Sequence, residues 1–346
     1  MDAAQDQAEI VRRSFPHGGV PVLAILGTGK SVVWETDKGP KSERRALLVR
    51  PPFLRPAHFE RAIGFLSGGS REGPEDHARV EAVFAAMRES WGTAGLVQRY
   101  ETFFERWAEQ LAFGFVRRLP HGNNTTSNIA FDGRLVDFGA TSAVPSWATI
   151  ATSRHRTPYL GLFAALSSGL DSLSYYFGRF VDAELGRSDH RTALRERARR
   201  VFVEHSAAEV LAVAGVPAAL ARTASRDLKI QAVTQDAIAI AQREAFDLIH
   251  SVPPHRPFSL DEAWNEAPLE PWRALAAVVR DLVPASEREA AKERCRLRVR
   301  PYPRLYAPTA RTTIYESLER TRSGPVEIQA FVDREVDDAL ATLGMA

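Results

Sequence analysis

Hydrophobic and polar positions divide the chain into a short β-rich beginning and a long helical remainder. Two runs rich in aliphatic and β-branched residues lie within 20–36, on either side of the glycines at 27–29, and a third apolar run spans 45–49. Short apolar runs separated by glycine and polar residues predict a small antiparallel sheet, here with a turn at 27–29. Residues 66–76 are rich in glycine and serine and predict a loop.

Helical periodicity dominates from about residue 77 onward. Apolar residues recur at helical spacing in segments 77–91 and 95–117, and the second segment carries many aromatic side chains. Residues 141–158 are expected to be irregular. Further helices are expected at about 159–185, 190–214, 217–250, 260–282, 285–297 and 325–343.

This order predicts an α+β chain with two lobes. The small β-rich N-lobe is expected at 1–76, and the large, mostly helical C-lobe at 77–346. A chain of 346 residues is long enough to give both lobes a sizeable core. A hydrophobic content of 45% and a charged content of 25% are ordinary for a soluble globular protein.

Charge and cysteine content narrow the class of protein. A formal net charge of +2 gives no electrostatic reason to expect a nucleic-acid or membrane partner. The single cysteine, Cys295, excludes an internal disulfide framework and a cysteine-based zinc site, and it fits a reducing cytoplasm. The polar N-terminus predicts no signal peptide, and no apolar run reaches the roughly 18 residues of a membrane span. We therefore expect a cytoplasmic protein.

The pattern richest in chemistry lies at 121–139, HGNNTTSNIAFDGRLVDFG. Asn128 follows His121 by seven residues, and Asp137, which begins an Asp-Phe-Gly sequence, follows Asn128 by nine. Between them, Asp132-Gly133 predicts the turn of a β-hairpin. Amide and carboxylate oxygens are ligands suited to Mg²⁺, which neutralises nucleotide phosphates in kinase-type transfer. The spacing therefore predicts a protein-kinase-like fold in which Asn128 and Asp137 hold Mg²⁺ and ATP.

A structural role for the same residues is the alternative, because Asn and Asp also cap backbone groups in turns. The ordered succession of His121-Gly122, the Asp-Gly turn and Asp-Phe-Gly favours the functional interpretation. His121 is expected to support the loop by a hydrogen bond rather than to act in catalysis. Gly122 allows a tight backbone turn.

The general base is the weak point of the pattern. Aminoglycoside phosphotransferases and related small-molecule kinases share HGDxxxxN, in which the base Asp follows the His by two residues. That position is Asn123 here, and the position before the metal ligand is Ser127. Neither side chain accepts a proton by itself at useful pH. Three alternatives stay open: a substrate that needs little deprotonation, a carboxylate from elsewhere in the chain, or a different chemistry.

Residues 24–31 also match a relaxed phosphate-loop motif, which ends in Gly29-Lys30-Ser31. A phosphate loop must open a helix, whereas the following VVWET is β-rich, so we reject that interpretation. In a kinase-like fold the glycines at 27 and 29 would instead form a hairpin turn. That turn would either cover the nucleotide or have only a structural role.

The loop resembles the motif HGxxNTDNxxxxGxxxD(Y/F)G of the selenoprotein O family of kinase-fold proteins. Eight residues stand in the same register without a gap, namely His121, Gly122, Thr126, Asn128, Gly133, Asp137, Phe138 and Gly139. The match is specific at 121–139 and looser over 20–180. The most similar pattern, HGxxxxSNIALDGRxxDFG, belongs to the MchC-like branch, named after a protein of microcin-maturation gene clusters.

The resemblance implies binding of ATP and Mg²⁺, metal ligation by Asn128 and Asp137, and transfer of AMP from ATP to protein hydroxyl groups. For the MchC-like branch it implies a ribosomal peptide, or its modifying group, as the substrate. Ser127 departs from the family, which has an Asp proposed as the base at that position.

The same resemblance extends to the nucleotide contacts. Leu26-Gly27-Thr28-Gly29-Lys30 resembles the family's LGDGR turn, so Gly27, Gly29 and Lys30 become candidate nucleotide-binding residues. The family's nucleotide-contacting lysine of the third strand falls near Arg50. Arginine keeps a permanent positive charge and binds phosphate through two hydrogen bonds, so this contact can survive the change.

We therefore expect a nucleotidyl- or phosphotransferase that acts on a protein or peptide, with Asn123, Ser127 and Asp137 as candidate catalytic residues. Two alternatives stay open. In the first, the chain is a catalytically altered pseudokinase subunit that scaffolds a peptide-modifying complex with a partner enzyme. In the second, it is a small-molecule kinase.

Overall fold

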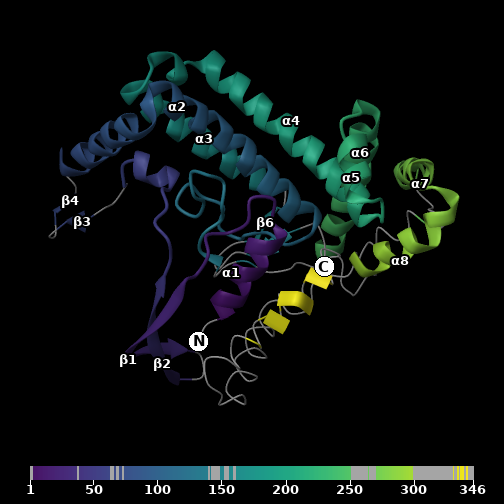
Figure 1. The fold of residues 1–346 in the computed structure, drawn as a ribbon, viewed down its shortest axis with the longest axis horizontal. Coiled ribbons are helices and arrows are strands. Elements are labelled where there is room, and N and C mark those ends of the chain that lie inside the picture. Colours follow the sequence, from purple (N-terminus) through teal and green to yellow (C-terminus); the bar gives the residue numbers. More distant parts are fainter. Residues whose placement is uncertain are drawn as a thin grey trace.

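The described part of the chain is mostly helical, with a small N-terminal antiparallel sheet of two strands, so that the protein is α+β overall (Figure 1). The computed structural model describes residues 3–36, 39–62, 66–67, 70–71, 74–138, 141, 149–151, 156–158, 161–250, 264, 270–298, 330, 333–334, 336–338 and 340–341.

The elements follow one another in a simple order. The helices are α1 (Ala3–Ser14), α2 (Pro74–Val116), α3 (Gly161–Phe180), α4 (Ser188–Val213), α5 (Ala218–Ala224), α6 (Leu228–His250), α7 (Glu270–Leu282) and α8 (Arg288–Arg298). The strands are β1 (Ala24–Thr36), β2 (Gly39–Val49), β3 (Leu66–Ser67), β4 (Ser70–Arg71), β5 (Thr149–Ala151) and β6 (Arg156–Pro158). Short 3₁₀ helices are η1 (Pro56–Phe59), η3 (Ala183–Gly186) and η5 (Ala285–Glu287).

Helix α2 is the central element, and α3 and α4 pack against it (Figure 1). It breaks at Gly92, whose backbone has φ 69° and ψ 165°, so the two predicted helices at 77–91 and 95–117 are confirmed as its two arms. Glycine adopts this conformation without a steric cost. The second arm buries a stripe of aromatic rings, including Tyr100, Phe103 and Trp107. This stripe is part of the main hydrophobic core, to which several other elements contribute.

The later helices agree with the sequence pattern in number and place, with one break that it missed. The expected helix at 217–250 is divided into α5 and α6, because Asp227 accepts the backbone N–H of Lys229 at 2.8 Å and begins a new helix. The expected start of a helix near 260 lies outside the described residues, apart from Trp264. The described residues between 330 and 341 are helical, as expected.

Helix α8 docks onto the C-terminal end of α4. Arg294 and Arg298 donate hydrogen bonds to the carbonyl oxygens of Gly215 and Ala212, at and just beyond the C-terminal end of α4. Gly215 has φ 99°, and the backbone of Ala291 lies directly against its Cα. The close approach of the two backbones fixes where α8 lies.

The N-terminal sheet differs from the sequence prediction in its turn. Strands β1 and β2 form one antiparallel ribbon whose register shifts between the Gly27–Ala46 and Ser31–Arg44 pairs. The predicted turn at 27–29 is therefore wrong, since these residues form a bulge inside β1. Gly29 has φ 67°, the backbone that a glycine supplies to a bulge as readily as to a turn.

Two stretches expected to lack regular structure contain short strand pairs. Within 66–76, β3 pairs with β4, and α2 already begins at Pro74. Within 141–158, β5 pairs with β6. Neither pair is longer than three residues per strand, which is too short to leave a periodic pattern in the sequence.

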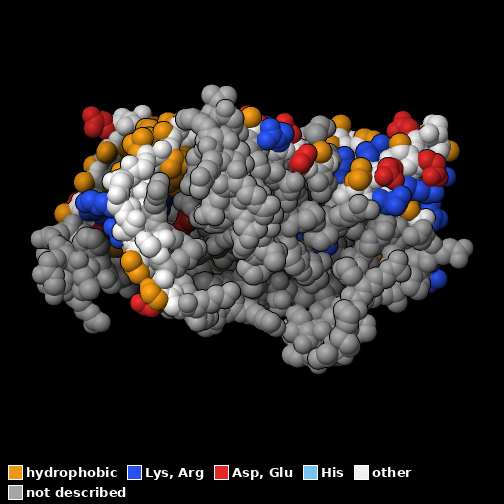
Figure 2. All heavy atoms as spheres, turned by 90° about the horizontal axis from the view of Figure 1, so that it is seen from below, with side chains coloured by type: hydrophobic (Ala, Val, Ile, Leu, Met, Phe, Trp, Pro, Cys, Tyr) orange, Lys and Arg blue, Asp and Glu red, His pale blue; other side chains and the backbone are white. Residues whose placement is uncertain are grey.

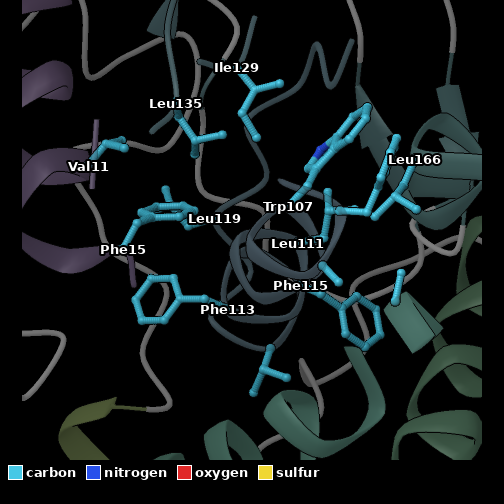
Figure 3. Close-up of a cluster of buried hydrophobic side chains, with 14 of the residues drawn as sticks. Val11, Phe15, Trp107, Leu111, Phe113, Phe115, Leu119, Ile129, Leu135 and Leu166 are labelled. Atoms are coloured by element: carbon cyan, nitrogen blue, oxygen red, sulfur yellow. The ribbon is translucent and has the colours of Figure 1, made fainter. Parts of the chain in front are cut away.

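Helix α1, for which the sequence analysis made no prediction, carries Ile10 and Val11, which join the core together with Phe15 just beyond the helix. The ring of Phe15 lies 4.7 Å from that of Phe113 in α2. Figure 3 shows Ile129 and Leu135, from the loop at 121–138, pointing into the same region. The N-terminal segment and the candidate site therefore share one core.

A carboxylate held between two histidines ties this segment to α2 and α4. Glu109 pairs with His17 and with His205. Burial would raise the pKa of Glu109, but hydrogen bonds from both histidines lower it to about 2. Burial would likewise lower the pKa of His205, but its hydrogen bond to Glu109 raises it above 6.5.

The pH dependence of stability follows from these shifts. The contribution of Glu109 is present above its ordinary pKa of 4.5 and is lost as the pH falls toward 2. The contribution of His205 is present below 6.5 and is lost as the pH rises through its raised pKa. The loss of unfolding free energy caused by His205→Gln, measured by urea unfolding, should therefore be larger at pH 5.5 than at pH 8. An equal loss at both pH values would contradict the assignment.

Within the described residues, no helix is both long and apolar enough to cross a membrane. Figure 2 shows hydrophobic side chains at the left of one face and interspersed basic and acidic side chains at its right. Exposed aliphatic residues lie on the ribbon, among them Leu26, Val33 and Leu47.

Candidate functional site

The loop at 121–138 folds as the predicted hairpin. Ala130 donates to the carbonyl of Arg134 at 2.7 Å, and Val136 donates to that of Asn128 at 2.9 Å. The turn between them has Gly133 at φ 91°, so the Asp-Gly turn is confirmed. A side chain on Gly133 would also meet Arg106 of α2 at 2.7 Å. Glycine is therefore needed there for both backbone and space.

Side chains from α2 hold this hairpin in place. The buried amide of Gln110 donates to the carbonyls of Gly18 and Gly133, both at 2.9 Å. Arg106 donates to the carbonyl of Asp132 at 3.0 Å. The ring of Phe131 stacks on that of Phe103 at 5.6 Å. The hairpin is thus fixed to the rigid central helix, which is what a positioned catalytic loop needs.

His121 supports the loop as expected. It is 3% exposed, and its Nε2 donates to the carbonyl of Val136 at 2.8 Å. Burial lowers the pKa of His121. Its ring also makes an edge contact with Phe138, with centroids 5.9 Å apart. A neutral, buried imidazole bonded to the backbone beside Asp137 is suited to shaping the loop rather than to exchanging protons.

Asn128 has its amide oriented by the loop itself. The side chain is 6% exposed, and Nδ2 donates to the carbonyl of Asn123 at 3.0 Å. Since that carbonyl can only accept, the amide oxygen Oδ1 must point elsewhere, and no donor among the described residues bonds to it. An amide oxygen left free in this way fits a role as a metal ligand.

Asp137 adopts an unusual backbone conformation. Its φ is 62°, in the left-handed region that few residues other than glycine visit, and its side chain is exposed. In a regular ladder, Asn128 and Val136 would share one face, and Asp137 would point to the other. The left-handed backbone interrupts that alternation at the predicted metal ligand. Strained backbone of this kind tends to mark functional sites.

Arg50 lies beside Asp137, directly after β2. Its guanidinium carbon lies 5.8 Å from the centroid of the Phe138 ring, and its buried Nη1 has no hydrogen-bond partner among the described residues. Burial lowers the pKa of Arg50, whereas the charge of Asp137 raises it and that of Arg55 lowers it. A buried N–H without an acceptor fits an anionic ligand such as phosphate.

Arg55 is a second cation here that the sequence analysis did not single out. It lies close enough to Arg50 to lower the pKa of that residue, and it stacks over Phe53 at 5.1 Å. Nothing in the sequence pointed to it as a site residue, because the prolines between Arg50 and Arg55 predict only an irregular chain. Arg50 and Arg55 therefore place two positive charges close together just after β2.

The two candidate base positions remain without a carboxylate. The carbonyl of Asn123 is bonded to the Asn128 amide, and the hydroxyl of Ser127 is bonded to that of Thr125 at 2.7 Å. The structure instead brings Glu60 to the loop, where its carboxylate accepts from the Thr126 hydroxyl at 2.5 Å. Glu60 lies outside the predicted motif, and a role for it as the base stays a prediction.

The remaining candidate residues lie on the ribbon. Gly27, Gly29 and Lys30 are exposed in β1, and the backbone N–H of Lys30 bonds to the hydroxyl of Thr28. No hydrogen bond or ion pair among the described residues joins them to Asn128 or Asp137. Their contact with a nucleotide stays a prediction. Gly139, the last residue of the motif, lies outside the described residues.

The described residues do not form a complete protein cage for a metal ion, and the metal roles of Asn128 and Asp137 stay a prediction. Within the described ranges, no three His, Cys, Asp or Glu side chains converge to hold a metal ion. Mg²⁺ usually keeps several waters and is bound by one or two protein ligands together with substrate phosphates, so the pair Asn128 and Asp137 suits it.

Comparison with known proteins found no match to any family model, curated protein or solved structure.

Proposed function

We propose that the protein binds ATP with Mg²⁺ at the 121–138 loop and transfers AMP or phosphate to a protein or ribosomal peptide. The observation that carries this proposal is the left-handed, exposed Asp137 beside the unpartnered buried Nη1 of Arg50. A strained carboxylate next to an unsatisfied guanidinium favours a ligand with both a metal ion and phosphates.

Each residue has a defined part in this proposal. Asn128 Oδ1 and the Asp137 carboxylate would hold Mg²⁺, which supplies neutralisation of the phosphate charge. Arg50 and Arg55 would bind phosphate oxygens, and His121 would keep the loop in shape through Val136. Phosphoryl transfer depends mainly on such positioning and charge neutralisation, so these residues carry the largest share of the expected rate.

The order of elements also supports a kinase-like fold with two lobes. A ribbon that ends at Val49, just before Arg50, is followed by a long helix, the hairpin with Asn128 and Asp137, and then helices. This is the arrangement expected from the resemblance to the selenoprotein O family and its MchC-like branch. The same resemblance favours AMP over phosphate as the transferred group.

A scaffolding pseudokinase is the second candidate, and one observation favours it. Neither Asn123 nor Ser127 can act as a base, and both are engaged in hydrogen bonds within the loop. A chain of this kind would bind nucleotide without transferring part of it, and would support a partner enzyme that modifies the peptide. Glu60 weighs against this candidate, since it places a carboxylate at the loop.

Labelled ATP separates these functions. The purified protein is incubated with Mg²⁺, an acceptor peptide and ATP labelled at either the α- or the γ-phosphate. If the acceptor hydroxyl attacks the α-phosphorus and pyrophosphate leaves, only the α-label is retained, which is the result we expect. Retention of the γ-label alone would indicate a kinase. Mg²⁺-dependent ATP binding with neither label retained would indicate the scaffold, and absence of ATP binding would overturn the proposal.

A further inference from the structure

The segment 17–20, between α1 and β1, pairs with the hairpin of the candidate site. Gly19 forms a parallel bridge with Leu135. Before Gly19, the carbonyl of Gly18 accepts from the N–H of Leu135 at 3.1 Å. After it, the N–H of Val20 donates to the carbonyl of Leu135 at 2.9 Å. The backbone of Gly19 is therefore held from both sides and cannot draw back from the hairpin.

Side chains of α2 hold the same segment in place. The amide of Gln110 donates to the carbonyl of Gly18 at 2.9 Å, and its oxygen accepts from the backbone N–H of His17 at 3.3 Å. The imidazole of His17 pairs with Glu109. Segment 17–20 is thus tied both to the central helix and to the hairpin.

Gly19 is the surface on which the Phe138 ring rests. A Cβ added to Gly19 would lie 2.6 Å from Cζ of Phe138, a distance that real Cβ atoms essentially never show. The ring is 1% exposed, makes an edge contact with His121 and has the guanidinium of Arg50 over it. A ring enclosed in this way cannot swing aside, so a side chain at position 19 would displace it.

The place of this ring bears on Asp137, the residue directly before it. Asp137 has a left-handed backbone, with φ 62°, and an exposed side chain. Such a backbone persists only where the surrounding structure fixes it. Since the side chain of Asp137 is not buried, the buried Phe138 is the neighbour that can supply this constraint.

We infer that Gly19 is a positioning residue for Asp137 and acts through the Phe138 ring. The missing side chain at Gly19 lets the ring lie flush against segment 17–20, and the ring in turn holds the strained backbone of Asp137. Where Mg²⁺ is concerned, this inference rests on the proposed function. The effect of Gly19 on the conformation of the loop does not depend on it.

Amide hydrogen exchange of the nucleotide-free protein tests the inference. Gly19→Ala should accelerate exchange in peptides that cover 128–138 by about tenfold or more, while peptides from α4 keep their wild-type rates. Adding Phe138→Leu to Gly19→Ala removes the end of the ring and should restore much of the slow exchange, because the added methyl then occupies the vacated space. Gly95→Ala is the matched control, since a Cβ there meets only Trp91, at 3.5 Å, and should leave the loop unchanged.

Titration with ATP in the presence of Mg²⁺ provides the second measurement. Gly19→Ala should weaken ATP binding by about tenfold, and the double variant should recover part of the loss. If the wild type binds no ATP, the proposed function fails, whereas hydrogen exchange still decides the role of Gly19.

Three results would overturn the inference: unchanged loop exchange in Gly19→Ala, equal acceleration in α4, or no recovery in the double variant. If Gly19→Ala does not fold by circular dichroism, the double variant decides. A folded double variant would support the contact between Gly19 and Phe138, and an unfolded one would overturn it.

Discussion

Replacing Asp137 by asparagine is expected to reduce transfer from Mg²⁺-ATP by roughly 100-fold or more, the scale seen when one electrostatic group is removed from a preorganised site. Asparagine tolerates the left-handed backbone at φ 62° as well as aspartate does, so the fold should survive. What is lost is the carboxylate charge that would hold Mg²⁺ beside Arg50. The rate of retention of α-labelled phosphate measures the effect.

Asp171→Asn is the matched control for this substitution. Asp171 is an exposed residue of α3 that pairs with Arg195 at the surface, where an ion pair contributes little. Its replacement should leave transfer nearly unchanged. If the protein is a scaffold, Asp137→Asn should instead abolish the Mg²⁺ dependence of ATP binding. Unchanged binding and unchanged transfer together would show that Asp137 is not a metal ligand.

Gly215→Ala is expected to lower the free energy of unfolding by about 3 kcal/mol, the sum of a strained left-handed backbone and overpacking. Gly215 has φ 99°, and an added Cβ would lie 2.8 Å from the carbonyl carbon of Ala291 and closer still to its oxygen. Backbone atoms cannot move aside as the end of a side chain can. Helix α8 would therefore have to leave the end of α4.

Urea unfolding of Gly27→Ala provides the comparison. Gly27 lies in β1 without a positive φ, and an added Cβ there would meet no atom within 4 Å. Its replacement should change stability by no more than about 0.5 kcal/mol. Equal losses for the two variants would mean that the close approach of Ala291 to Gly215 does not determine how α8 docks.

The elements that the sequence predicted well are those whose signal is local. The two arms of α2 each carry a long apolar stripe, and the Asp-Gly turn of the hairpin depends on two adjacent residues. The bulge at 27–29 was mistaken for a turn, because glycine between two β-rich runs permits either. The partner strand decides between them, and only the pairing of Gly27 with Ala46 and Ser31 with Arg44 reveals it.

The candidate site likewise contains residues that the sequence revealed and residues that only the tertiary structure brings together. Asn128 and Asp137 were found from their spacing, but the left-handed backbone of Asp137 has no counterpart in the residue pattern. Glu60 reaches the loop across 66 positions of sequence. Gly19 meets the Phe138 ring only because segment 17–20 pairs with the hairpin. Contacts of this kind depend on tertiary packing, which periodicity does not report.

The β1–β2 ribbon can open to solvent locally, without unfolding of the helices around it. None of the side chains described in β1 or β2 is buried, so the ribbon adds nothing to the hydrophobic core around α2. A two-stranded ribbon by itself is only marginally stable in water. Its amide protons should therefore exchange with solvent through local opening, at a small fraction of the free energy needed to unfold the helices. The strand with Gly27, Gly29 and Lys30 can fray and close again while the hairpin with Asn128 and Asp137 keeps its geometry.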